Sequence, residues 1–296
     1  MSLWLAATLF ASAVQALRFL LQKRMSLAGA GPAAATFARF VYAPPVLALG
    51  LAVFTVRGGT MPALGPGFWP YALAGGVSQI LATMCVVALF SRRNFAVGMA
   101  FSKTTVLMTV GVGFLLLGEL PRAGEVAAIM AGVAGVLLLS MPKGAGWRAG
   151  LTDPATLYGL ASGAFFSISG VSYRGASLAV ATDEPILRAA VTLLFVTALQ
   201  TALLAAWLVW RDRDGLRRVF TGWRVSAAIG ATSMLGSLGW FTAYTLQQAA
   251  LVNAVGQVEL ILSLAISWLA LGERIAPREL AGVALIGGSV AALLLL

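Results

Sequence analysis

The stretch "LGELPRAGEVAAIMAGV" at residues 117–133 has a counterpart, "LGERIAPRELAGVALIG", at residues 271–287. In both copies a long apolar run ends in Leu-Gly-Glu, a few polar residues follow, and a second apolar run begins, so that Glu119 corresponds to Glu273. The two copies lie 154 residues apart in a chain of 296 residues. A repeat at this spacing indicates that the chain contains two copies of one structural unit.

The composition around these stretches is typical of a membrane protein. Hydrophobic residues make up 60% of the chain and charged residues only 10%, whereas soluble domains contain about 25% charged residues. A helix of about 20 apolar residues crosses the hydrocarbon core of a bilayer, and runs of this kind follow one another with short linkers between them. They predict ten transmembrane helices, near residues 3–22, 33–56, 68–90, 94–117, 123–141, 155–178, 185–210, 223–247, 250–271 and 278–296. Pro44 and Pro45 predict a kink within the second of these spans.

Each repeat unit contains five of the predicted spans. We place the units at residues 1–141 and 155–296, with a linker at residues 142–154. Because five is an odd number, the two units must cross the membrane in opposite directions. The predicted fold is therefore an all-α membrane protein with ten transmembrane helices in two inverted five-helix repeats. Secondary transporters often have this architecture, with the substrate site near the midplane between the repeats.

These features resemble one known family. Ten spans, a Leu-Gly-Glu that closes the fourth span of each unit and a glycine-rich last span are similar to the EamA-type branch of the drug/metabolite transporter superfamily. The resemblance covers nearly the whole chain. It implies a secondary transporter whose fourth and ninth spans line a central cavity, but it leaves the substrate open, because this family moves amino acids, sugars, nucleotide-linked metabolites and drugs.

The membrane orientation has two conflicting indications. Most Lys and Arg residues lie on the linkers that follow odd-numbered spans. Cytoplasmic loops carry an excess of these residues, so the charge bias predicts that both termini lie outside. The family resemblance implies that both termini lie in the cytoplasm.

Two charged residues lie well inside predicted spans. Lys103 is in the fourth span and Glu259 is in the ninth, and the repeat aligns Lys103 with Gln257. A charge at the centre of a transmembrane helix costs at least about 2.5–3.5 kcal/mol, and such residues are usually functional. We interpret Glu259 as the carrier of a coupling proton and Lys103 as the partner of an anionic substrate group. The alternative is a salt bridge that only ties the two units together.

Further candidates for substrate binding lie on the central spans. Arg39 and Arg188, near the starts of the second and seventh spans, are matched by the repeat and are expected at opposite mouths of the cavity, where they attract an anion. The alternative is that their side chains snorkel to the headgroups, as we expect of Arg18 and Arg174. The remaining predicted site residues are Ser102, Trp240, Tyr244, Asn253 and Gln257.

The glutamates of the two Leu-Gly-Glu motifs have two interpretations. Glu119 and Glu273 each lie just before a predicted helix, where a carboxylate favours the positive helix N-terminus by roughly 0.3–1 kcal/mol. Capping is the simpler interpretation. A gate at the mouth of the cavity is the alternative.

Several classes of function are excluded by the residues that the chain lacks. It has no histidine and a single cysteine, Cys85, which excludes a His/Cys metal site and a disulfide within the chain. We expect no cofactor, no catalytic residues and no ATP-driven pump, since no phosphate-binding Gly-Lys loop is present. The formal net charge of +10 reflects membrane topology, so no nucleic-acid partner is expected. The expected partners are a small-molecule substrate and the lipid bilayer, and two fused units suffice for a functional monomer.

The predicted function is therefore secondary active transport across the inner (plasma) membrane. The excess of Lys and Arg over acidic residues in the spans favours a small amphipathic metabolite that is anionic or zwitterionic, either amino-acid-like or an organic acid. We expect alternating access and proton-coupled export. Export of cationic or neutral drugs, which would depend on Glu259 and Trp240, is the alternative. A non-transporting membrane receptor or enzyme is a third interpretation.

Overall fold

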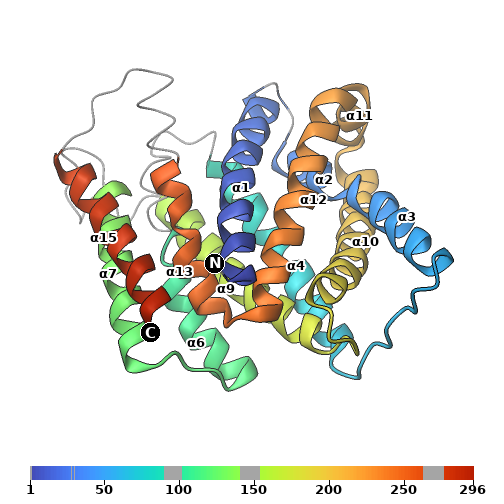
Figure 1. Ribbon diagram of the computed structural model, residues 1–296. Coiled ribbons are helices and arrows are strands. Elements are labelled where there is room, and N and C mark those ends of the chain that lie inside the picture. The colour runs from blue at the N-terminus through green and yellow to red at the C-terminus, as the bar shows by residue number, and fades with distance from the viewer. Residues whose placement is uncertain (1, 28, 30, 90–101, 141–153, 263–276) are drawn as a thin grey trace.

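The computed structural model describes residues 2–27, 29, 31–89, 102–140, 154–262 and 277–296. Across these residues the chain is almost entirely helical (Figure 1). The one extended pairing within them is an isolated antiparallel bridge between Leu64 and Val180. An all-helical bundle satisfies every backbone hydrogen bond within its own helices, which is what a chain in a lipid environment requires.

The helices follow the predicted apolar runs closely. Those of the first unit are α1 (Leu3–Leu27), α2 (Pro32–Phe40), α3 (Ala43–Val56), α4 (Phe68–Leu89), α6 (Thr105–Leu117) and α7 (Ala123–Ser140). Those of the second unit are α9 (Pro154–Leu178), α10 (Pro185–Arg211), α11 (Arg213–Thr221), α12 (Trp223–Leu246), α13 (Ala249–Gly256) and α15 (Pro277–Leu295).

Away from the candidate site, the predicted spans and the observed helices differ in two places. The span predicted at 33–56 is divided into α2 and α3, so the chain does bend within this span as predicted. Pro44 and Pro45 lie in the first turn of α3, where a missing backbone N–H costs no hydrogen bond. A short amphipathic helix, α11, forms within a segment that we expected to be a linker. Its N-cap is Asp212, whose carboxylate accepts a hydrogen bond from the Gly215 backbone N–H at 2.8 Å.

The apolar helices and their surface are those of a multi-pass membrane protein. Four helical segments are long and apolar enough to cross a bilayer, at Leu3–Gln22, Pro32–Val56, Phe68–Leu89 and Pro185–Arg211. Shorter apolar helices accompany them. Large hydrophobic side chains face outward, among them Leu49 and Leu115, the latter 79% exposed. Lipid chains, unlike water, are a favourable environment for such a surface.

The centre of the bundle is built from helices of both units. α1 packs along α12, α4 packs along α9, and α7 lies beside α15 at one side (Figure 1). Gly132 and Gly135 bring α7 close to α15: a Cβ at Gly135 would lie 2.7 Å from the Gly282 carbonyl oxygen. Small residues at such crossings are typical of membrane helices. α1, α4, α9, α10 and α12 then surround the candidate site.

Candidate functional site

A polar cavity lies inside the bundle, between the two units. It is lined by α1, α2 and α4 from the first unit and by α9, α10 and α12 from the second. The segments around the start of α6 and the end of α13 complete it. The predicted site residues that line it are Arg39, Ser102, Lys103, Trp240, Tyr244, Asn253, Gln257 and Glu259.

A chain of polar contacts crosses the cavity from α1 to the residues beside α6. Lys103 Nζ lies 3.5 Å from Glu259 Oε2. The same carboxylate oxygen accepts a hydrogen bond from Gln15 Nε2 at 2.9 Å. Gln15 Oε1 in turn accepts from Arg18 Nη2 at 3.3 Å. One buried carboxylate therefore serves a direct lysine partner and, through the Gln15 amide, an arginine.

Arg39 lies at a second point of the cavity wall, at the end of α2. Its Nε donates to Ser233 Oγ at 3.0 Å and its Nη1 donates to Thr83 Oγ1 at 2.7 Å. The Gln79 amide is oriented with its oxygen toward the guanidinium, 2.7 Å from Nη2 and 3.0 Å from Nη1, because the opposite orientation would set its N–H donors against those of Arg39. The residue is 3% exposed.

Two helices are interrupted where they meet the cavity. A turn at Lys103 and Thr104 precedes α6, and α13 ends at Gly256 with Gln257 as its C-cap. These interruptions fall on positions that the repeat aligns, Lys103 with Gln257. Half-helix ends at the bilayer midplane present partial charges to a bound substrate or ion.

Side chains from three helices form a second polar chain beside the aromatic part of the wall. Tyr244 Oη donates to Asn253 Oδ1 at 2.7 Å, and Asn253 Nδ2 donates to Thr109 Oγ1 at 2.9 Å. The ring of Trp240 is stacked near that of Tyr244, with centroids 5.9 Å apart. The cavity thus combines charged, neutral polar and aromatic surfaces.

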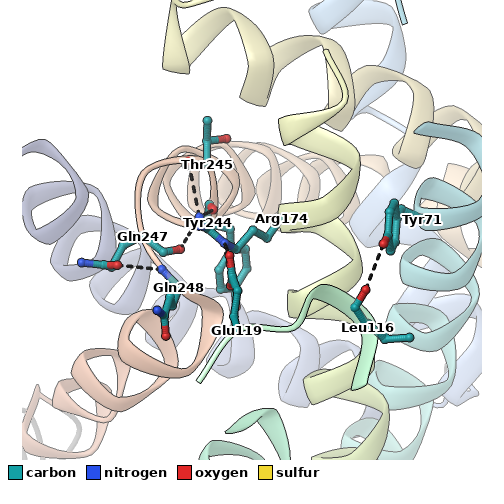
Figure 2. A network of polar contacts seen from close by, with 8 residues as sticks. All are labelled: Tyr71, Leu116, Glu119, Arg174, Tyr244, Thr245, Gln247 and Gln248. Carbon is teal, nitrogen blue, oxygen red and sulfur yellow. Dashed lines mark hydrogen bonds and ion pairs between the residues drawn. The ribbon is translucent and has the colours of Figure 1, made fainter. Parts of the chain in front are cut away.

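An ion pair beside the cavity joins α9 to the turn after α6 and to the C-terminus of α12 (Figure 2). Arg174 Nε lies 2.8 Å and 2.9 Å from the two carboxylate oxygens of Glu119. Its Nη1 donates to the carbonyl oxygens of Tyr244 at 2.7 Å and of Gln247 at 2.8 Å, at the C-terminus of α12. A cation at this position binds the unpaired carbonyls and favours the negative end of the helix. The neighbours Tyr173 and Tyr244 line the cavity.

The structure corrects our expectations for four residues. Arg188 lies outside the cavity, donates a hydrogen bond to the Thr182 carbonyl and is 4.0 Å from Asp183 Oδ1, so it does not share a site with Arg39. Arg39 itself is deep in the wall and is not at a mouth. The prediction of snorkelling is wrong for Arg18 and Arg174, because both guanidinium groups turn inward to buried polar partners.

The contacts of Glu119 do not support its interpretation as a helix cap. Its carboxylate binds Arg174, and the first turn of α7 is capped by Glu125, which accepts from the Arg122 backbone N–H at 2.6 Å. Glu273, its repeat counterpart, lies outside the described residues.

The sequence analysis missed the neutral partners of Arg39. Thr83 and Ser233 hold its guanidinium, and the Gln79 amide donates to Ser169 Oγ on α9. Gln79 was itself expected to line the site, and the 154-residue repeat aligns it with Ser233, so a search for polar residues at matched positions in both units would have found Ser233. Among the described residues, no group of three or more His, Cys, Asp or Glu side chains is arranged to hold a metal ion.

The second half of the chain is similar in sequence to a known protein family. Residues 154–295 match the model of the EamA-like transporter family. No curated protein matches the chain in sequence. A protein of known crystal structure has the same fold, with a TM-score of 0.67 over 98% of both chains and 19% sequence identity. Members of the matched family are transporters. Residues 154–295 are therefore similar to the EamA-like transporter family, which is part of the drug/metabolite transporter superfamily.

Proposed function

We propose that the protein is a secondary active transporter that moves a small anionic or zwitterionic metabolite across the inner membrane by alternating access and proton-coupled export. The observation that carries this proposal is the cavity itself. It lies in the middle of an apolar bundle, both units line it, and it contains the buried charges of Arg39 and Glu259 and the partly buried charge of Lys103. Intramembrane charges around a cavity mark substrate and proton pathways.

The packing of the helices supports two inverted five-helix repeats at residues 1–141 and 155–296. The repeat relates α1 to α9 and α4 to α12. It therefore converts the α1–α12 contact into the α9–α4 contact, and both pairs pack extensively. It also exchanges α7 with α15, which pack on each other. A pseudo-two-fold axis in the membrane plane produces such exchanged pairs, and rocking of one unit against the other then exposes the cavity to each side in turn.

The contact between Lys103 and Glu259 supports the coupling step. An acidic group of the substrate that binds Lys103 takes away the cation next to Glu259. The carboxylate then favours its protonated form, because a buried charge without a partner is costly. Substrate binding and proton binding are thereby linked.

The Glu119–Arg174 pair is the closed gate in this proposal. It joins the turn after α6, the end of α9 and the C-terminus of α12. When the cavity opens at this end, these three segments separate and the pair breaks. The C-terminal end of α1 and helix α11, which carry Arg24 and Arg218, lie toward the opposite end (Figure 1). The positive-inside bias puts that basic end in the cytoplasm, so we propose that the gate faces outside.

The test is flux in proteoliposomes with an imposed proton gradient. Amino acids, organic acids and cationic dyes are offered to wild type, Lys103→Gln and Glu259→Gln. Gradient-driven movement of an anionic or zwitterionic compound that is lost in both variants supports the proposal. Movement of cationic dyes alone, unchanged in Lys103→Gln, supports drug export instead, for which the stacked Trp240 and Tyr244 beside Glu259 provide a binding surface. Gradient dependence that survives in Glu259→Gln contradicts the coupling role.

A further inference from the structure

Among the residues that the structure describes, the charged groups at the cavity do not balance. Three cations belong to this region, Arg18, Arg39 and Lys103. Of the carboxylates in the part of the chain that the structure describes, Glu259 is the one that lines the cavity. Arg18, Arg39 and Glu259 are all buried. A cluster with three positive charges and one negative charge requires further negative charge when it is desolvated.

The Oε2 atom of Glu259 already has two partners. Its Oε2 faces Lys103 Nζ at 3.5 Å and accepts from Gln15 Nε2 at 2.9 Å. Gln15 also links this carboxylate to Arg18, because its Oε1 accepts a hydrogen bond from Arg18 Nη2 at 3.3 Å. A substrate ammonium group at Oε2 would compete with Lys103 and would add a further positive charge to the cluster.

Arg39 is the cation that most clearly lacks a counter-ion. Within the described residues, no carboxylate lies in ion-pairing distance of its guanidinium, and its acceptors are the neutral side chains of Thr83, Ser233 and Gln79. These contacts hold the planar group in one orientation at the cavity wall. They occupy four of its five N–H donors, so an acidic group binds the remaining Nη2 N–H and, to bind in the bidentate manner, must take the place of the Gln79 oxygen.

We propose that the transported substrate carries a net negative charge and that Arg39 binds its acidic group. This inference rests on the proposed function and narrows it, because it excludes zwitterions and cations as the principal substrates. Suitable compounds are dicarboxylates and phosphate monoesters. Either class supplies carboxylate or phosphate oxygens that the Arg39 guanidinium can bind. Either class also lowers the net positive charge of the cluster.

The experiment is uptake into proteoliposomes from one equimolar mixture, with the internal contents measured by mass spectrometry. The mixture contains succinate, 2-oxoglutarate and glycerol 3-phosphate, the zwitterions leucine and glutamine, and the cations arginine and putrescine. Wild type is compared with Arg39→Gln, Arg39→Lys and Arg188→Gln. Arg188 is the matched control because the repeat pairs it with Arg39 in the sequence and the structure leaves it outside the cavity.

The expected result is uptake of an acidic compound only. Loss of a charge-assisted hydrogen bond should weaken its apparent affinity about 10- to 100-fold in Arg39→Gln. Arg39→Lys keeps the charge without the fork and should give an intermediate loss, which separates a binding role from a failure to fold. Arg188→Gln should transport like wild type.

Three results overturn the inference. Preferred uptake of a zwitterion or a cation overturns the inference but leaves the proposed transport function in place. Acidic uptake of unchanged affinity in Arg39→Gln does so as well. If nothing in the mixture moves in wild type, the inference fails together with the proposed function.

Discussion

Lys103 and Glu259 are 156 residues apart in the sequence, yet their charged groups meet at 3.5 Å inside the cavity. Each residue comes from a different unit, and Gln15 binds the same carboxylate oxygen from α1. The contact therefore couples the two halves at the point where the proposed substrate binds. Its contribution to stability and its contribution to transport can be measured separately.

The stability of this pair should be strongly non-additive. Lys103→Gln and Glu259→Gln each leave one buried charge without its partner, which lowers the free energy of unfolding by about 3 kcal/mol. The double variant leaves neither charge, so it should lose clearly less than the sum of the two single losses. Thermal unfolding of the purified protein in detergent measures all four proteins. Additive losses would show that the two groups do not interact.

The Glu119–Arg174 gate should open more often when its carboxylate is neutralised. Glu119→Gln replaces a charge-assisted contact worth about 1–2 kcal/mol, which shifts the ratio of open to closed forms by about 5- to 30-fold. Ser237 lines the cavity. The measurement is the labelling rate of Ser237→Cys in a Cys85→Ser background, with an impermeant maleimide added on the gate side.

The matched control for the gate is Glu125→Gln. Glu125 is an acidic residue at the same end of the bundle, but it contacts the Arg122 backbone and not Arg174. Its labelling rate should equal that of the unmodified background. Equal rates for Glu119→Gln and the background would leave the pair with no role in closing the cavity.

The sequence predicted the helices well and the orientation of their side chains less well. The apolar runs are long and are separated by charge or by Gly and Pro, so their limits follow from length alone. Lys103 and Glu259 could be found because a charge deep inside a span needs a reason to be there. Both residues line the cavity.

Arg39 and Arg188 show why the remaining site residues could not be placed from the sequence. Their spans are apolar on every side, so the hydrophobic pattern does not indicate which face of the helix meets the cavity. The rotation of each helix is set by its neighbours. The break between α2 and α3 directs Arg39 inward, whereas Arg188 lies one turn after the start of α10 and binds the Thr182 carbonyl in the preceding loop.

The hydroxyl group of Tyr244 should matter more for stability than that of Tyr71. Tyr244→Phe removes the donor to Asn253 Oδ1 from a buried chain of hydrogen bonds, which costs about 1–3 kcal/mol. Tyr71→Phe removes an exposed bond to the Leu116 carbonyl at 3.1 Å and should cost less than about 0.5 kcal/mol. Thermal unfolding of the two variants compares them directly. Equal losses would mean that the Tyr244–Asn253 bond is not maintained.

The close approach of α7 and α15 predicts opposite effects for two Gly-to-Ala substitutions. A Cβ at Gly135 would lie 2.7 Å from the Gly282 carbonyl oxygen and 2.9 Å from Leu285 Cβ, so Gly135→Ala must push the two helices apart and should cost about 1–3 kcal/mol. At Gly288, on α15, nothing lies within 4 Å of an added Cβ. Gly288→Ala should therefore be neutral or stabilising by up to about 1 kcal/mol, because alanine favours a helix over glycine. Thermal unfolding in one detergent gives both values. A Gly135→Ala variant as stable as Gly288→Ala would show that these helices do not pack through backbone contact, and the pair that lies on the proposed two-fold axis would then need a different arrangement.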